Sequence, residues 1–272
     1  MLFSLSAINN YLSLYYNFME NLPLTNQDIF TYMDGDVIPY IQPIIDSTTN
    51  ALVGAEVLMR IKRNDGTIIP PSDFINKIEQ EGKLISATRF IMNKIIHFFK
   101  NKAEKLPEGF YFSFNISAAH FHDDELANDC QNFIDAFNGK IGLVIELLEC
   151  SILEFNHKTI TTIKLLTKKG VRFALDDFGS GLSRVIYFHY APISIVKLDR
   201  TLMKSKKNRM EYADVLNALY AFSQQLNLTV IAEGIETESQ KKKMSEIGVK
   251  YHQGFLYSKP VSEEVFTLNF LH

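Results

Sequence analysis

Two acidic side chains stand next to each other at the end of an apolar segment. Asp176 and Asp177 follow the β-rich residues 171–175 and precede a Gly-x-Gly loop in the stretch FALDDFGSGLSR. Adjacent carboxylates repel each other, so an ionised pair needs a neutralising charge nearby. A bound cation supplies that charge, although an acidic pair in this position can also cap a following helix. The pair is therefore a candidate metal site that needs support from other segments.

Further polar residues occur at or near the carboxyl ends of other apolar segments. Taken alone, each has a plain structural explanation: Lys197 can form a surface ion pair with Asp199, and Asn115 can cap a helix. Glu146 and Glu149 can line a solvated edge in the same way. In an α/β barrel, however, the carboxyl ends of the strands converge at one face, where active sites form. Repetition of the pattern favours one shared pocket, to which we assign Glu56, Asn115, Glu146, Lys197, Glu233 and Gln253.

The donor types in this set favour a hard divalent cation. Carboxylate and amide oxygens suit Mg²⁺ or Mn²⁺, and no histidine or cysteine takes these strand-end positions. Several carboxylates in one pocket favour two cations, an arrangement that suits attack of water on a phosphodiester. Lys197 can orient that water, and Arg60 can hold a substrate phosphate. A Schiff base at Lys197 is the alternative chemistry, but nearby carboxylates keep a lysine protonated and disfavour it.

Short β-rich segments alternate with helical patterns beyond residue 35, as in an α/β barrel or a wound sheet. The first two segments flank the turn DSTTN, which is too short for a parallel crossover, so we expect them to pair antiparallel. We predict strands at 36–45, 51–60, 110–116, 141–147, 171–177, 193–199, 228–234 and 251–255. Amphipathic helices are predicted between them, for example at 74–82, 88–106, 125–138, 159–170 and 212–227.

Composition limits the classes of protein to which the chain can belong. It has 272 residues, 46% of them hydrophobic and 22% charged, which is typical of one globular domain. The net charge of −3 gives no support for a surface that tracks long nucleic acid. Cys130 and Cys150 do not make a disulfide framework, so we expect a reducing cytoplasm.

The first 30 residues differ from the rest in being rich in leucine and tyrosine. No lysine or arginine precedes Arg60, and Asn9 and Asn10 interrupt the apolar run, so we expect neither a signal peptide nor a membrane span. We predict an amphipathic leader helix at 1–30, which packs on the domain or makes a dimer or sensor contact. The domain itself is predicted to cover 31–272.

Eight motifs follow one another along the chain: YIQPI (40–44), EVLMR (56–60), FNIS (114–117), ELLE (146–149), DDFGSGLS (176–183), VKLDR (196–200), IAEGIET (231–237) and QGFLYSKP (253–260). With these motifs the chain resembles the EAL domains, bacterial phosphodiesterases that act on cyclic di-GMP. The resemblance runs from about Val37 to about Val261. It implies an α/β fold, a TIM-like (β/α)8 barrel whose first strand is antiparallel.

The resemblance also implies roles for individual residues, again as expectations. Two Mg²⁺ or Mn²⁺ ions would be held, one by Glu56, Asn115, Glu146 and Asp176 and the other by Asp176, Asp177 and Glu233. Lys197, Glu233 and Glu236 would be catalytic, with Lys197 activating water, and Glu149 would anchor the DDFGSGLS loop. Substrate contacts would come from Gln42, Leu58, Arg60, Asp199, Gln253 and Pro260.

The expected reaction opens cyclic di-GMP to linear pGpG, and a homodimer is expected because this family couples the DDFGSGLS loop to dimerisation. Two positions depart from the family pattern: Val57 replaces an alanine, and Leu148 replaces a threonine. Neither position is a metal ligand, but the loss of a hydroxyl at Leu148 weakens the expected hold of Glu149 on the loop. The alternative is a cyclic di-GMP receptor or protein-interaction module with little or no turnover. We expect control to act through the leader, dimerisation, expression or an external partner.

Overall fold

The computed structural model describes residues 31–148, 154–180, 186–206 and 209–271. The predicted leader helix at 1–30 and the predicted loop anchor Glu149 lie outside these residues, as does most of the loop that follows the adjacent aspartates. No helix within the described ranges has both the length and the apolar character needed to cross a membrane.

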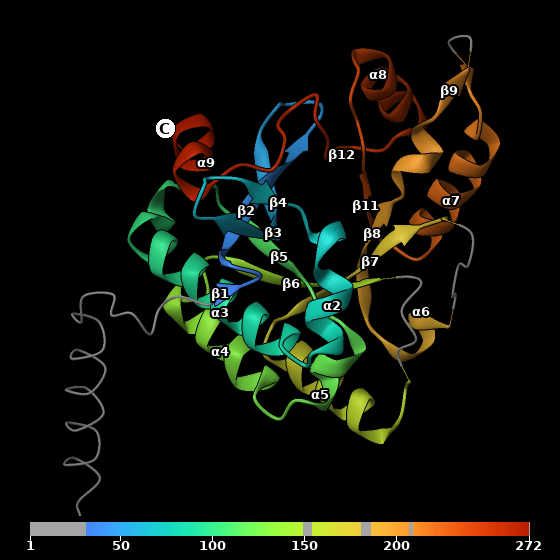
Figure 1. The fold of residues 1–272 in the computed structure, drawn as a ribbon. Helices are drawn as coiled ribbons and strands as arrows, with labels where there is room; N and C mark the ends of the chain where they lie inside the picture. The colour runs from blue at the N-terminus through green and yellow to red at the C-terminus, as the bar shows by residue number, and fades with distance from the viewer. Residues whose placement is uncertain (1–30, 149–153, 181–185, 207–208, 272) are drawn as a thin grey trace, which may run out of the picture.

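Eight strands close into a barrel at the centre of the molecule, with helices around it (Figure 1). Strand β2 is antiparallel to both of its neighbours, β3 and β12, and the remaining neighbours are parallel. This confirms the predicted mixed α/β barrel with an antiparallel first strand. The strands are β2 (Gly35–Asp46), β3 (Leu52–Arg63), β5 (Tyr111–Asn115), β6 (Gly142–Leu148), β7 (Arg172–Phe178), β8 (Ile193–Leu198), β11 (Thr229–Ala232) and β12 (Tyr251–His252).

The turn between β2 and β3 explains why the barrel begins with a hairpin. Asp46 Oδ1 accepts hydrogen bonds from the backbone N–H groups of Thr48 at 2.9 Å and Thr49 at 3.3 Å. Asn50 follows with a φ of 56°, which asparagine tolerates better than most residues. The two long strands then pair from Gly35 opposite Arg63 to Ile45 opposite Leu52. The predicted antiparallel pairing is confirmed.

The predicted helices are present with shifted ends. The segment predicted at 88–106 forms α3 from Leu84 to Phe99 and continues as the 3-10 helix η3 (Lys100–Lys105). Leu106 is extended, with a ψ of 140°, because the proline that follows it disfavours the helical region. The others are α2 (Ile75–Gln80), α4 (Leu126–Ala136), α5 (His157–Lys168), α6 (Tyr187–Tyr190), α7 (Ala213–Gln225), α8 (Glu238–Ile247) and α9 (Glu263–Phe270).

Short elements complete the described fold. They are the strands β1 (Thr31–Tyr32), β4 (Ile68–Ile69), β9 (Ser205–Lys206) and β10 (Arg209–Met210), and the 3-10 helices η2 (Pro71–Asp73), η4 (Ala118–His122) and η5 (Arg200–Met203). β1 pairs antiparallel with β2, and β4 pairs antiparallel with β3. β9 and β10 pair antiparallel with each other in a separate two-stranded sheet.

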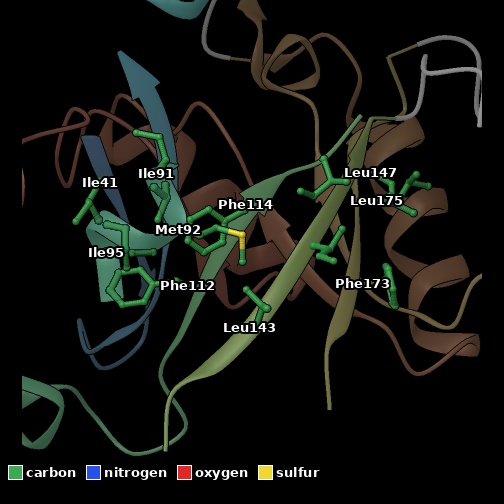
Figure 2. Close-up of a cluster of buried hydrophobic side chains, with 14 of the residues drawn as sticks. Ile41, Ile91, Met92, Ile95, Phe112, Phe114, Leu143, Leu147, Phe173 and Leu175 are labelled. Atoms are coloured by element: carbon green, nitrogen blue, oxygen red, sulfur yellow. The ribbon is translucent and has the colours of Figure 1, made fainter. Parts of the chain in front are cut away.

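The hydrophobic core lies between the outer face of the barrel and the helices. Figure 2 shows Phe112 and Phe114 of β5 close to Met92 of α3, and all three side chains are buried. Side chains alternate across a strand, so residues of β5 between these two phenylalanines and after them point into the barrel. The outward-facing side chains of β5 therefore pack in the hydrophobic core. Its inward-facing side chains lie outside this core and can be polar.

Two buried histidines are expected to make the protein less stable in acid. Burial lowers the pKa of His120 and of His252 to about 4, whereas an unfolded histidine takes up its proton near 6.5. Between these values the unfolded chain binds more protons at these two histidines, so their contribution to the free energy of unfolding falls as the pH falls from 6.5 to 4. By pH 5 each histidine is expected to cost about 2 kcal/mol of stability.

The contribution of one histidine can be isolated by urea unfolding at pH 7 and pH 5. The wild type is expected to lose about 2 kcal/mol more than His120→Leu over this interval. His97→Leu, at an exposed position of α3, is the control for the substitution itself. Equal losses in the wild type and in His120→Leu would show that His120 does not carry this sensitivity.

Candidate functional site

Eight polar side chains predicted from the sequence meet inside the barrel at the carboxyl ends of its parallel strands. Alternation along the strands turns them inward, so segments far apart in the chain contribute to one layer. Six of them are less than a tenth exposed, while Asn115 and Glu233 are half-buried. The structure thus brings together Gln42, Glu56, Asn115, Glu146, Asp176, Lys197, Glu233 and Gln253.

Lys197 is the centre of this layer. Only 1% of the lysine is exposed. Its Nζ lies 2.7 Å from Glu146 Oε2 and 2.8 Å from Glu233 Oε1. It also lies 3.0 Å from Glu56 Oε2 and 3.1 Å from Asp176 Oδ1. One ammonium group therefore faces four carboxylates, which excludes the surface ion pair considered for Lys197 from the sequence.

The backbone at Asp177 explains how two adjacent carboxylates reach the same site. Side chains of neighbouring strand residues normally point to opposite faces. Asp177 instead has a φ of 56°, in the left-handed region, and the pairing of β7 with β8 shifts register between Leu175 and Phe178. One carboxylate oxygen from each of Asp176, Asp177 and Glu233 consequently lies within 4.8 Å of the other two.

Amide side chains fix the orientation of Glu56. Asn115 Nδ2 donates to Glu56 Oε1 at 2.8 Å, and Gln253 Nε2 donates to Glu56 Oε2 at 2.8 Å. Gln253 Nε2 also lies 3.2 Å from Gln42 Oε1, and Gln42 in turn donates to the carbonyl of Ser258 at 3.1 Å. The network joins β2, β3, β5 and the segment after β12 around one carboxylate.

Lys197 and Glu56 are both held in their charged forms. Burial alone would lower the pKa of Lys197, but the surrounding carboxylates, Asp176 most strongly, raise it well above its ordinary value. Burial alone would raise the pKa of Glu56, but the charge of Lys197 and hydrogen bonds from its neighbours hold that pKa below its ordinary value.

The other carboxyl groups bind protons more tightly than usual. Burial, reinforced by the charge of Glu56, raises the pKa of Glu146 to about 8. Burial and the charge of Asp176 raise the pKa of Asp177 to about 7, and a hydrogen bond to Asp199 adds to this rise. Burial also raises the pKa of Asp176 and of Glu233. A single lysine does not neutralise all of these groups.

The donor set fits a hard divalent cation. Asp176, Asp177 and Glu233 offer closely grouped carboxylate oxygens, and such ligands suit Mg²⁺ and Mn²⁺. One buried oxygen of the site, Gln253 Oε1, accepts no hydrogen bond from the described residues. Asn115 donates through its nitrogen, which leaves its amide oxygen available as a further ligand.

A cavity of about 200 Å³ opens beside these carboxylates. It is lined in part by Gln42, Leu58, Asp177, Glu233 and Glu236, all of which the sequence placed in the site. A second, more apolar cavity of about 310 Å³ lies between β3 and helices α2 and α3. Glu56 and Leu58 line both cavities, so β3 separates two spaces that meet at one carboxylate.

Three residues predicted to contact the substrate are not among the lining residues of these two cavities. The Arg60 guanidinium lies over the Tyr40 ring at 5.7 Å and donates to the Met59 carbonyl at 2.8 Å. Asp199 accepts from the backbone N–H of Thr201 at 2.7 Å. Pro260 precedes a residue whose backbone pairs with β2. Their contacts with substrate stay predictions.

The cavity lining also includes residues to which the sequence gave no role. Arg200 and Phe255 line the 200 Å³ cavity, and Phe255 is 53% exposed there. Gly234 allows Arg200 to approach, because a Cβ on Gly234 would lie 2.4 Å from Arg200 Cβ and its φ is 64°. The sequence offered one signal for each of these two residues. Arg200 directly follows Asp199, and Phe255 directly follows the pair Gln253-Gly254.

Replacing Gly254 by alanine is expected to destabilise the protein by about 3 kcal/mol. A Cβ at Gly254 would lie 2.1 Å from the carbonyl oxygen of Ile235 and 2.3 Å from its nitrogen, and backbone atoms cannot yield as a flexible side chain can. Urea unfolding measures the loss. Gly82 is the matched control, because its φ is 68° but no atom lies within 4 Å of the added Cβ, so Gly82→Ala should cost only about 1 kcal/mol. Equal losses for the two variants would contradict the steric account.

The chain is similar in sequence to a known protein family and to individual relatives. The family model described as EAL domain matches residues 29–260. The probable cyclic di-GMP phosphodiesterase PdeG of Escherichia coli (strain K12) is 31% identical over 230 residues, covering 84% of this chain and 45% of PdeG. The cyclic di-GMP phosphodiesterase PdeL of the same strain is 31% identical over 229 residues, covering 84% of this chain and 63% of PdeL. This chain spans less than two thirds of the length of either relative.

Solved structures show the same fold. The PaMucR phosphodiesterase in complex with c-di-GMP superposes with a TM-score of 0.75 at 24% identity, covering 85% of this chain and 94% of that one. An EAL domain protein from Listeria monocytogenes EGD-e gives a TM-score of 0.72 at 24% identity, covering 86% and 92%. The barrel architecture is therefore shared with both.

Proposed function

The chain belongs to the EAL domain family, and we propose that it is a metal-dependent phosphodiesterase that hydrolyses cyclic di-GMP to linear pGpG. The observation that carries this proposal is the convergence of five carboxylates, Asn115 and Lys197 beside an open cavity at the carboxyl end of the barrel. The two relatives named above as cyclic di-GMP phosphodiesterases support the choice of substrate.

The chain's own residues divide into two groups of metal ligands in this proposal. Glu56, Asn115, Glu146 and Asp176 would hold one divalent cation, and Asp176, Asp177 and Glu233 would hold the other. Bound Mg²⁺ or Mn²⁺ would supply positive charge for the phosphoryl oxygens and lower the pKa of the attacking water. The hydrogen bonds from Asn115 and Gln253 would keep the Glu56 carboxylate oriented in this way during the reaction.

Lys197 acts as a fixed cation in the proposed reaction. Its raised pKa keeps it protonated, so it donates hydrogen bonds and does not accept the proton of water. A buried positive charge beside the attacking water favours the deprotonated form of that water. Glu236 is exposed and lines the cavity, where it can pass the released proton to solvent.

The protonated state of Lys197 also counts against the aldolase considered from the sequence. An imine forms from the neutral amine, and here four carboxylates within 3.1 Å stabilise the ammonium form. The remaining alternative is a receptor that binds cyclic di-GMP without turnover. Retention of every matched ligand residue favours the enzyme.

Incubation with cyclic di-GMP tests the proposal. The purified protein is given the nucleotide with Mg²⁺, with Mn²⁺ or with a chelator, and the products are separated. We expect pGpG only in the presence of a divalent cation. Binding of intact cyclic di-GMP with no product under either ion would identify a receptor, and absence of binding as well would reject both.

The proposal extends to the cellular setting. We place the protein in the cytoplasm, where its nucleotide substrate is made, and propose that it works as a homodimer. Light scattering on the purified protein should then give twice the chain mass of 31.2 kDa. A measured mass equal to that of one chain, at the concentration used in the activity assay, would contradict the proposed homodimer. It would not affect the proposal that the protein hydrolyses cyclic di-GMP.

A further inference from the structure

The inward rows of the barrel carry polar residues at both ends. On β5, Tyr111 lies on the same face as Asn115, at the other end of the strand. On β7, Arg172 likewise lies on the same face as Asp176 and begins the strand. Four residues of strand span about 13 Å. A layer of apolar side chains lies between the two ends, made of Ile44, Val144, Ala174, Ile195 and Ile231. The foot of the barrel is therefore separate from the carboxylate site.

A cavity of about 250 Å³ opens at this foot. Two residues of opposite charge, Arg172 and Glu108, line it. Neither forms an ion pair with the other or with another residue in the ranges that the structure describes. The rest of the lining is in part aromatic and apolar, with Tyr111, Tyr251, Leu52 and Val53.

The cavity wall is built with close contacts. The Arg172 guanidinium lies 4.6 Å from the centre of the Tyr111 ring. The lack of a side chain at Gly54 makes room for the Tyr111 ring, because a Cβ on Gly54 would lie 2.6 Å from Tyr111 Cε1 and Cζ. Gly142 has the same effect on the other side, where a Cβ would lie 3.1 Å from Tyr111 Cβ and 3.3 Å from Arg172 Nη2. The ring and the guanidinium are thus held together before any ligand arrives.

Arg172 keeps its hydrogen-bonding capacity in this arrangement. Its face stacks on Tyr111, and no residue of the described chain accepts a hydrogen bond from its N–H groups. A stacked guanidinium presents a fork of donors that matches a carboxylate. The exposed Glu108 on the same cavity offers an acceptor for an ammonium group.

We propose that this cavity is a second ligand site, which binds a small α-amino acid or a zwitterion of similar size. The carboxylate of the ligand bonds to Arg172, its ammonium group bonds to Glu108, and its side chain packs on Leu52 and Val53. A cavity of about 250 Å³ has room for a molecule of this size.

Calorimetric titration of the intact chain with three matched probes tests the ligand class. The probes are L-leucine, 4-methylpentanoate, which lacks the ammonium group, and 3-methylbutylamine, which lacks the carboxylate. L-leucine is expected to bind saturably and about tenfold or more tightly than either analogue, since each loses one charged contact. No saturable binding of L-leucine, or equal binding of 4-methylpentanoate, would overturn the proposal.

Charge-neutral variants then test the two residues. Arg172→Gln is expected to weaken both L-leucine and 4-methylpentanoate about tenfold or more, while Glu108→Gln weakens L-leucine alone. The exposed Arg63 at the end of β3 does not line the cavity, so Arg63→Gln should bind like the wild type. Thermal unfolding checks that each variant is folded. Unchanged L-leucine affinity in folded Arg172→Gln or Glu108→Gln would overturn the assignment, whatever the outcome for cyclic di-GMP.

Discussion

Replacing Glu233 by glutamine is expected to lower the rate of cyclic di-GMP hydrolysis by about a thousandfold while leaving a folded protein. Glu233 lies 2.8 Å from Lys197, and its oxygens group with those of Asp176 and Asp177. Glutamine keeps the shape of the side chain but removes the negative charge that a divalent cation requires. The measurement is pGpG release under saturating Mn²⁺.

The control for this prediction is the same chemical change away from the site. Glu246 is exposed on α8 and lies 3.9 Å from Lys242, so Glu246→Gln should keep the turnover of the wild type. Glu56→Gln should behave like Glu233→Gln, because Glu56 is the carboxylate that the amide network orients. Near-normal turnover by folded Glu233→Gln would reject the assignment of Glu233 as a ligand.

The strand order could be predicted because each strand carries two separate signals. Its outward row is apolar, as at Phe112 and Phe114, and its inward row turns polar at the carboxyl end, as at Asn115. The turn DSTTN between the first two strands predicted the antiparallel start, because it is too short for a parallel crossover. These signals lie within a few residues of one another, so a single sequence contains them.

Other parts of the site depend on backbone geometry that residue types do not specify. The left-handed φ of Asp177 decides that adjacent carboxylates converge, and the sequence offered only their adjacency. Arg200 enters the cavity wall because Gly234 lets the chain pass closely after β11. Lys197 could be placed at the rim from its strand, but its position among four carboxylates follows from closure of the barrel.

Replacing Lys197 by methionine is expected to lower the free energy of unfolding of the metal-free protein by about 3–5 kcal/mol. Methionine keeps much of the apolar stem but removes the charge that all four buried carboxylates contact. Those carboxylates must then take up protons or repel one another. Urea unfolding in the presence of a chelator measures the loss, and Lys62→Met, at an exposed position of β3, should show almost none.

Divalent cations should reverse part of this loss, because they can supply the positive charge that the variant lacks. Mn²⁺ is therefore expected to raise the melting temperature of Lys197→Met by more than it raises that of the wild type. Hydrolysis should remain low even when stability returns, since the metal replaces the charge of the lysine but not its hydrogen bonds to the attacking water. A metal-free Lys197→Met variant as stable as the wild type would show that the carboxylates do not need the lysine. Full activity in the same variant would remove Lys197 from the reaction and leave the ligand residues as the whole of the catalytic site.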